Sequence, residues 1–187
     1  MTTEPPRKRD AQATRARILN AAQEAFSRTS FRDTGIRQIA AMAGTSSTLL
    51  LQYFGSKAGL YEAALQAAMP VASVLSLPRE TFGAALADAL LKPGIAIRPP
   101  LMIAFAAGDT EAVAIAARVT EERAIAPLAK WLGPPDGRAR ALEIAALDTG
   151  LVTYTKHLPL PASSRKDVRT VSAWFARTIQ NIVDAAD

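Results

Sequence analysis

Apolar residues recur at spacings of three and four along most of the chain, which is the period of an amphipathic helix. On the first predicted helix, residues 10–28, Ile18, Ala22 and Ala25 follow this spacing. No long stretch alternates with the period of two that is typical of a strand. The pattern therefore predicts an all-α protein with about nine helices.

Glycine, proline and capping residues predict where the other helices begin and end. Gly44 stands where a C′ glycine ends a helix, and Thr34 is a candidate N-cap of the helix before it. Pro127 is expected to kink or divide a long helix, because proline has no backbone N–H. After the first, the predicted helices span residues 36–43, 46–54, 57–69, 79–91, 99–107, 109–132, 138–157 and 164–185.

Residues 36–54 form the motif that points most directly to a function. Two short helices joined at Gly44 predict a helix-turn-helix, whose second helix enters the major groove of DNA while the first crosses the backbone. Leu50 is expected to anchor the second helix on its own core. Ser47, Thr48 and Gln52 then face outward with groups that match base edges, and glutamine is well suited to adenine.

Side chains around this reading helix can reach the DNA backbone. Lys57 lies in the first turn of the next helix, where backbone N–H groups and the ammonium can share one phosphate. In the alternative interpretation Ser46 only caps its helix, Tyr53 only packs, and Arg37 pairs with an acid. The side chains expected to bind DNA are Thr34, Arg37, Thr45, Ser46, Ser47, Thr48, Gln52, Tyr53 and Lys57.

The net charge lies entirely in the N-terminal third. Residues 1–60 contain nine basic and four acidic residues, whereas the 13 basic and 13 acidic residues of the remainder cancel. A basic segment on a neutral chain is typical of a protein that meets a polyanion through that segment alone. The alternative is that basic residues only aid solubility. Residues 1–9 are interpreted as a flexible basic arm.

The stretch from Thr34 to Tyr61 resembles the tetracycline-repressor-like (TetR/AcrR) transcriptional regulators. The resemblance covers roughly residues 12–65. It implies a helix-turn-helix DNA-binding domain over residues 10–56 and a helical regulatory and dimerisation domain over residues 57–187. The residues that carry it are Arg15, Ile18, Ala21, Ala22, Phe26, Ile39, Ala40, Ala43, Gly44, Ser46, Tyr53, Phe54, Ser56, Lys57 and Leu60.

Leu49 and Leu51 depart from this family pattern. Family members commonly have threonine and tyrosine at these two positions, which often face DNA. A leucine can meet a thymine methyl group but cannot form a hydrogen bond to a phosphate. We therefore expect an altered recognition sequence, or weaker backbone anchoring offset by the basic arm.

The last two helices are expected to form the dimer. Small residues on one helix permit close approach, and the other carries an apolar stripe. The resemblance implies a four-helix interface between two copies, and the alternative is that both stripes are buried within the monomer. The expected interface residues are Leu142, Ala146, Gly150, Thr153, Val171, Phe175, Ile179 and Ile182.

A small, mostly apolar effector is implied by the resemblance, as is a repressor that the effector releases from a near-palindromic operator. The candidate pocket residues are Leu86, Leu101, Met102, Phe105, Trp131, Tyr154 and His157. The alternative for each of them is an ordinary place in the core.

Other functions find little support in the sequence. With no cysteine, a single histidine and no phosphate-binding loop, we expect no enzyme, no cofactor and no metal site. No apolar run is long enough to span a membrane, and no signal peptide is present, so we expect a cytoplasmic protein. The alternatives are a sequence-tolerant nucleoid-type DNA-binding protein and a helical binding module that has lost operator binding.

Overall fold

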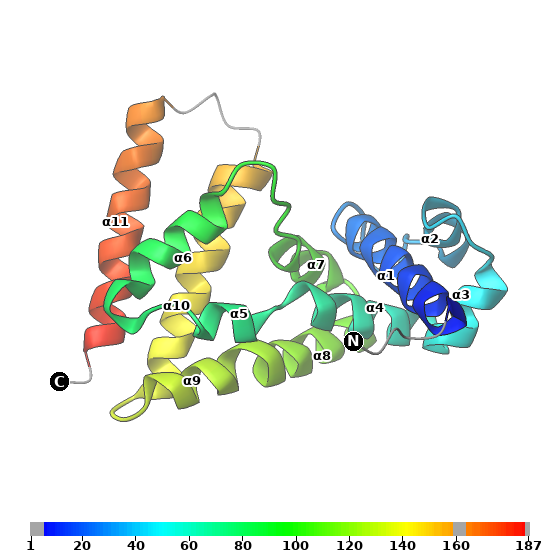
Figure 1. The fold of residues 1–187 in the computed structure, drawn as a ribbon, viewed down its shortest axis with the longest axis horizontal. Coiled ribbons are helices and arrows are strands. Elements are labelled where there is room, and N and C mark those ends of the chain that lie inside the picture. The colour runs from blue at the N-terminus through cyan, green and yellow to red at the C-terminus, as the bar shows by residue number, and fades with distance from the viewer. Residues whose placement is uncertain (1–5, 159–163, 186–187) are drawn as a thin grey trace. The chain divides into compact units, whose positions relative to one another are not determined.

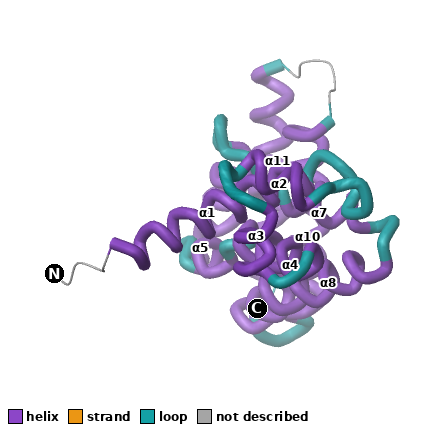
Figure 2. The backbone as a smooth tube through the Cα atoms, turned by 90° about the vertical axis from the view of Figure 1, so that its right-hand side faces the viewer, coloured by secondary structure: helices purple, strands orange, loops and turns teal. Residues whose placement is uncertain are grey.

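The computed structural model describes residues 6–158 and 164–185, which consist of helices and loops (Figures 1 and 2). The all-α expectation is confirmed. The chain forms two compact units, Met1–Met69 with Leu101–Val119 and Pro70–Pro100 with Thr120–Asp187, which we call the head unit and the body unit. In the described ranges no single helix is long and apolar enough to cross a membrane, although a broken pair, Lys57–Leu75 with Arg79–Leu91, passes on length and composition alone.

The head unit contains three N-terminal helices, the helix that follows them, and most of two later helices. The first helix begins at Pro6, so the prediction of a non-helical arm through residue 9 is wrong for residues 6–9. Proline is tolerated in the first turn of a helix because the N–H it lacks has no intrahelical partner there. Residues 1–5 of the predicted arm lie outside the described residues. The helices are α1 (Pro6–Phe26), α2 (Ile36–Met42), α3 (Ser47–Phe54), α4 (Lys57–Ala68), α7 (Pro99–Ala106) and α8 (Thr110–Thr120).

An aromatic cluster holds the head unit together. The Tyr61 ring packs edge-on against Phe26 and Phe31, with centroid distances of 5.1 and 5.4 Å. Its hydroxyl donates a hydrogen bond to the Met102 carbonyl at 3.0 Å, and the Phe31 N–H donates to the Phe105 carbonyl at 3.1 Å. Because these bonds attach α7 to α4 and to the loop after α1, the compact units do not divide at the predicted boundary between residues 56 and 57.

The body unit contains the remaining helices. The predicted helix 109–132 is α8, a π turn and α9, and Pro127 is the second residue of α9. A π turn directly before the proline gives its ring the room that a regular helix lacks. Five residues were too few for periodicity to predict α5. The elements are α5 (Val71–Leu75), η1 (Arg79–Thr81), α6 (Phe82–Leu91), η2 (Glu121–Ile125), α9 (Ala126–Leu132), α10 (Gly137–Val152), η3 (Thr153–His157) and α11 (Arg165–Asp184).

Close helix packing and two arginines, of which Arg140 is buried and Arg79 is half-buried, organise the body unit. At Gly83 of α6 a Cβ atom would lie only 2.0 Å from the Ala176 carbonyl oxygen of α11, so the two helices touch backbone to backbone. The Arg140 guanidinium donates to four carbonyl oxygens at the C-terminal ends of α9 and α11, at 2.7–3.4 Å. Arg79 donates to three carbonyls at the same two ends. A cation at a helix C-terminus is stabilising because the unpaired carbonyls there carry partial negative charge.

Candidate nucleic-acid interface

A tight turn separates α2 from α3. Gly44 adopts a φ of +62°, in the left-handed region that favours glycine, as expected for a residue that ends a helix. The Thr45 N–H donates to the Ala40 carbonyl at 3.0 Å, which satisfies one of the last carbonyls of α2. The Ser46 side chain accepts a hydrogen bond from the Leu49 N–H at 3.1 Å and so caps α3. The helix-turn-helix geometry thus follows from three adjacent residues.

The reading helix α3 has one buried side and one exposed side. Leu50 is fully buried in the core of the head unit, as predicted. Thr48 and Gln52 are exposed, whereas Ser47 is half-buried. Arg37, in the first turn of α2, is exposed as well. The side chains expected to face base edges are therefore available at the surface, and Thr48 and Gln52 point most directly outward.

Thr34 is a correction to the sequence-based set. Its side chain is 1% exposed, so it cannot reach DNA. The Thr34 hydroxyl donates to the Ser30 carbonyl at 2.9 Å and lies 2.8 Å from the Thr29 hydroxyl. These bonds close the loop between α1 and α2. Gly35 stands at the N-cap of α2 and provides no side-chain cap, so the assignment of Thr34 as that cap was also wrong.

Tyr53 and Lys57 make contacts within the head unit. Tyr53 is half-buried, and its hydroxyl donates to the Ala11 carbonyl at 3.4 Å. The Lys57 ammonium donates to the Arg32 carbonyl at 3.0 Å and lies 4.7 Å from the centroid of the Phe31 ring. Partial burial lowers the pKa of Lys57, an effect that Asp109 and Asp33 oppose. Because an ammonium has three donors, one bond to a carbonyl leaves others for a phosphate.

Two known protein families match this chain, one in its N-terminal part and one in its C-terminal part. Residues 18–64 match the family described as "Bacterial regulatory proteins, tetR family". Residues 80–183, more than half of the chain, match the family described as "Tetracyclin repressor-like, C-terminal domain". The chain belongs to the TetR family. The resemblance found in the helix-turn-helix sequence therefore extends into the body unit.

Individual TetR-family proteins resemble this chain over different lengths. The HTH-type transcriptional regulator RutR of Escherichia coli K12 is 47% identical over 60 residues, which are 32% of this chain and 28% of RutR. The match thus spans less than a third of that relative. A TetR-family regulator from Streptomyces coelicolor A3 is 25% identical with a TM-score of 0.55, over 98% of this chain and 99% of that one. A Rhodococcus protein, 21% identical with a TM-score of 0.64 over 94% and 98% of the two chains, shares the fold.

The expected dimer residues of this TetR-family chain fall into three groups by their exposure. Phe175 and Ile179 are fully buried against α6 within the body unit, so their assignment to a dimer interface is wrong. Burial within the monomer, which is the alternative that the sequence left open, therefore holds for the part of the α11 stripe that contains Phe175 and Ile179. Leu142, Ala146 and Val171 are exposed, whereas Gly150, Thr153 and Ile182 are half-buried.

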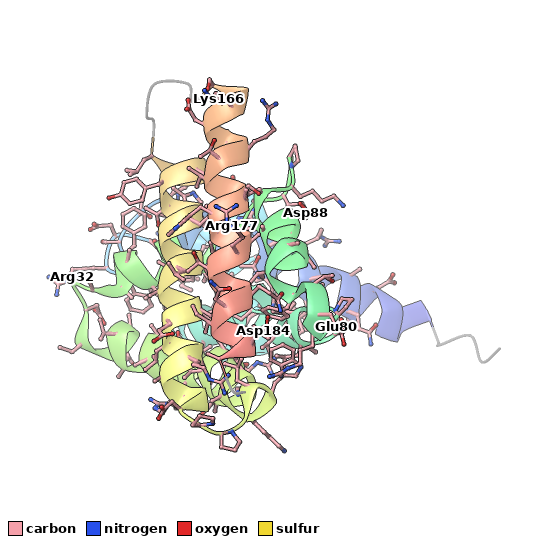
Figure 3. The ribbon with its side chains drawn as sticks, turned by 90° about the vertical axis from the view of Figure 1, so that its left-hand side faces the viewer. Arg32, Glu80, Asp88, Lys166, Arg177 and Asp184 are labelled. Carbon is pink, nitrogen blue, oxygen red and sulfur yellow. The ribbon has the colours of Figure 1, made fainter. Side chains whose placement is uncertain are left out.

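The N-terminal half of α11 also carries exposed apolar side chains. Val168, Val171 and Trp174 recur at a spacing of three and are 44, 40 and 48% exposed. Figure 3 shows α10 beside α11, with Arg177 labelled on α11. Leu142 of α10 is 48% exposed. Trp174 was missed in the sequence, although its spacing from Val171 is the signal that could have found it.

The candidate effector residues do not come together in one site within either unit. Leu101, Met102 and Phe105 belong to the head unit, and the other four belong to the body unit. Met102 is fully buried in the core of the head unit, and Leu86, 2% exposed, belongs to the core of the body unit. Those two have an ordinary place in the core, which was the alternative for each candidate.

The other body-unit candidates lie in three different settings. The Trp131 ring packs 4.7 Å from the Phe82 ring and 4.7 Å from the Arg79 guanidinium, while Tyr154 is 65% exposed. His157 lines a cavity of about 540 Å³ with Lys156 and residues 91–97. The Lys156 ammonium and the His157 ring bond to carbonyls of that loop at 2.8–3.0 Å. Of the seven candidates, His157 is the one that lines this cavity.

Gly59 is a residue of the interface that sequence reasoning missed. A Cβ atom at this position would lie 2.3 Å from the Phe54 carbonyl oxygen, so the turn from α3 into α4 requires glycine. The Ser56 side chain accepts a hydrogen bond from the Gly59 N–H at 3.0 Å and caps α4. This turn places Lys57 directly after the reading helix. A glycine in the first turn of a helix was the available signal, since glycine is unfavourable there without a packing reason.

Proposed function

We propose that this TetR-family chain is a sequence-specific DNA-binding transcriptional regulator. It acts in the cytoplasm as a homodimeric repressor that a small effector releases from a near-palindromic operator. The observation that carries the proposal is the exposure of Thr48 and Gln52 on the outer side of α3, opposite the buried Leu50. The net positive charge of residues 1–60 supports it, because the phosphate backbone supplies most of the affinity of such proteins.

The outer side of α10 and α11 is the proposed dimer interface. It combines the exposed apolar side chains of Leu142, Val171 and Trp174 with the small residues Ala146 and Gly150. Exposed apolar side chains on two adjacent helices are typical of a protein interface. A pair of chains would present two reading helices to half-sites about 34 Å apart, one turn of DNA.

Release of the operator requires an effector that prefers one arrangement of the two reading helices. A ligand that binds both arrangements equally shifts nothing, and a coupling of about 1–3 kcal/mol is typical of such regulators. We propose a small, mostly apolar effector. Its support is the family resemblance.

Selection of bound sequences from random DNA tests the proposal. We expect a near-palindrome, bound by a dimer whose affinity falls steeply as the salt concentration rises. Equal affinity for selected and random DNA would instead support the nucleoid-type alternative. No binding to any DNA would refute both.

Two substitutions separate backbone contacts from base contacts. Lys57→Ala is expected to weaken binding to all sequences and to reduce the salt dependence, whereas Gln52→Ala is expected to change the preference at particular bases. Lys166→Ala removes an exposed cation of α11 and is the charge-matched control (Figure 3). If Lys57→Ala and Gln52→Ala both bind like the parent protein, the docking of α3 is wrong.

A further inference from the structure

The exposed side of α3 has a polar centre and apolar flanks. Successive residues of a helix are rotated by about 100°, so with Leu50 pointing inward Thr48 and Gln52 lie nearly opposite to it. Leu49 and Leu51 then lie about 100° from Leu50, one on each flank. They are 36 and 40% exposed. Any groove that receives Thr48 and Gln52 therefore also meets two leucine side chains.

Neither leucine belongs to the core of the head unit. Leu50 already anchors α3 to the core, and Ser46 already caps its first turn. Residues 47–54 contain no charged side chain, so α3 offers no ion pair to a phosphate. The leucines are continuous with the proposed reading surface, so the partner that covers them must carry apolar groups beside hydrogen-bonding ones.

The major groove of DNA contains an apolar group of this kind. Each thymine projects a C5-methyl group there, and apolar side chains recognise it by contact. In an A·T pair this methyl lies on the same groove edge as the adenine N6 and N7, the atoms that a glutamine amide bonds in a bidentate way. Gln52 and the two leucines beside it therefore match both the polar and the apolar groups that an A·T pair presents in the major groove.

We propose that Leu49 and Leu51 contact thymine methyl groups on either side of the base pair that Gln52 meets, so that each half-site of the operator carries thymines at these positions. This inference rests on the proposed function. It adds that the specificity of this chain depends on methyl contacts at the two positions where it departs from the family pattern.

Replacement of thymine by deoxyuridine tests the inference, because uridine pairs identically but lacks the C5-methyl group. The binding constant of the selected operator is measured by fluorescence anisotropy at fixed salt, with single thymines replaced in both half-sites. Removing a methyl contact weakens binding about fourfold, and therefore about 15-fold when both half-sites change. We expect this loss at two thymine positions per half-site.

Alanine variants assign each methyl group to a leucine. At one of the two positions, Leu49→Ala is expected to bind the operator with uridine as tightly as the operator with thymine. Leu51→Ala is expected to show the same equality at the other position. Both side chains are exposed and alanine favours the helix, so both variants should fold, which circular dichroism checks. Val113→Ala, which trims an exposed side chain of α8 in the same unit, should keep the full uridine effect.

The outcomes distinguish this inference from the function on which it rests. A protein that selects a palindrome but binds its uridine form equally well keeps the proposed function and loses the methyl contacts. A selected half-site without thymine overturns the inference in the same way. A uridine effect that persists in both leucine variants assigns the contact to other residues, and a protein that binds no DNA refutes both proposals.

Discussion

We expect Asp148 to make the folded protein more stable at low pH than at neutral pH. It lies on α10 between Ile144 and Leu151, which are 1 and 6% exposed and belong to the core of the body unit. Its Oδ1 atom is buried and has no hydrogen-bond partner among the described residues. Burial raises the pKa of Asp148 to about 7 from the usual 3.8, because the charged form loses its hydration.

The raised pKa of Asp148 sets the sign and the size of the pH effect on the unfolding free energy. A carboxyl whose pKa is higher in the folded state holds its proton more tightly there, so it stabilises the fold at low pH. This contribution is lost as the pH rises from about 4, where the unfolded chain releases the proton, to about 7, where the folded chain does. About three pKa units correspond to at most about 4 kcal/mol of unfolding free energy.

Asp148→Asn removes the titrating group and keeps the shape of the side chain. We expect the variant and the parent to have similar unfolding free energies at about pH 3, where the carboxyl is protonated in both the folded and the unfolded chain, and the variant to be more stable by about 2–4 kcal/mol at about pH 8. Urea unfolding followed by far-ultraviolet circular dichroism measures both, at one fixed protein concentration because a dimer's stability depends on it.

A matched control isolates the buried group. Asp88→Asn removes an exposed carboxylate of α6 and accounts for the general effect of losing one charge (Figure 3). The reasoning is refuted if the difference in unfolding free energy between the parent and Asp148→Asn is the same at both pH values. A parent that gains stability between about pH 4 and about pH 7 relative to this variant would contradict the sign.

Three further substitutions test the packing of the two units by the same urea assay. Arg140→Met should lower the unfolding free energy by about 3 kcal/mol, because it leaves buried carbonyls of α9 and α11 unpaired. A loss no larger than that of the exposed control Arg138→Met would contradict the role of the Arg140 guanidinium. Gly83→Ala should lower the unfolding free energy by about 1–3 kcal/mol, because its Cβ overlaps the backbone of α11. The control Gly108→Ala has open space around its Cβ and should change the unfolding free energy little. Equal effects of the two variants would argue against the close crossing of α6 and α11. Ser46→Ala should lower the unfolding free energy by about 1 kcal/mol through the lost cap of α3, and Ser46→Asn should retain most of that stability. An unchanged urea midpoint for Ser46→Ala would show that the cap contributes nothing.

The sequence by itself determined the helices and the reading motif, because both depend on local physics. The spacing of apolar residues predicts which side of a helix is buried, and Leu50 is buried as that spacing requires. Gly44 ends α2 because its left-handed φ is favourable only for glycine, wherever the chain lies. The exposure of Thr48 and Gln52 follows from these two facts.

Only the tertiary structure decided what each buried side packs against. The stripe that contains Phe175 and Ile179 fits a partner chain as well as it fits α6, and the backbone contact at Gly83 shows that α6 covers it. Thr34 was expected to cap α2 and to bind DNA, yet its hydroxyl is used within its own loop. The spacing of apolar residues indicates which side of a helix is buried. Which residues cover that side depends on contacts between residues far apart in the chain, and no local pattern records those contacts.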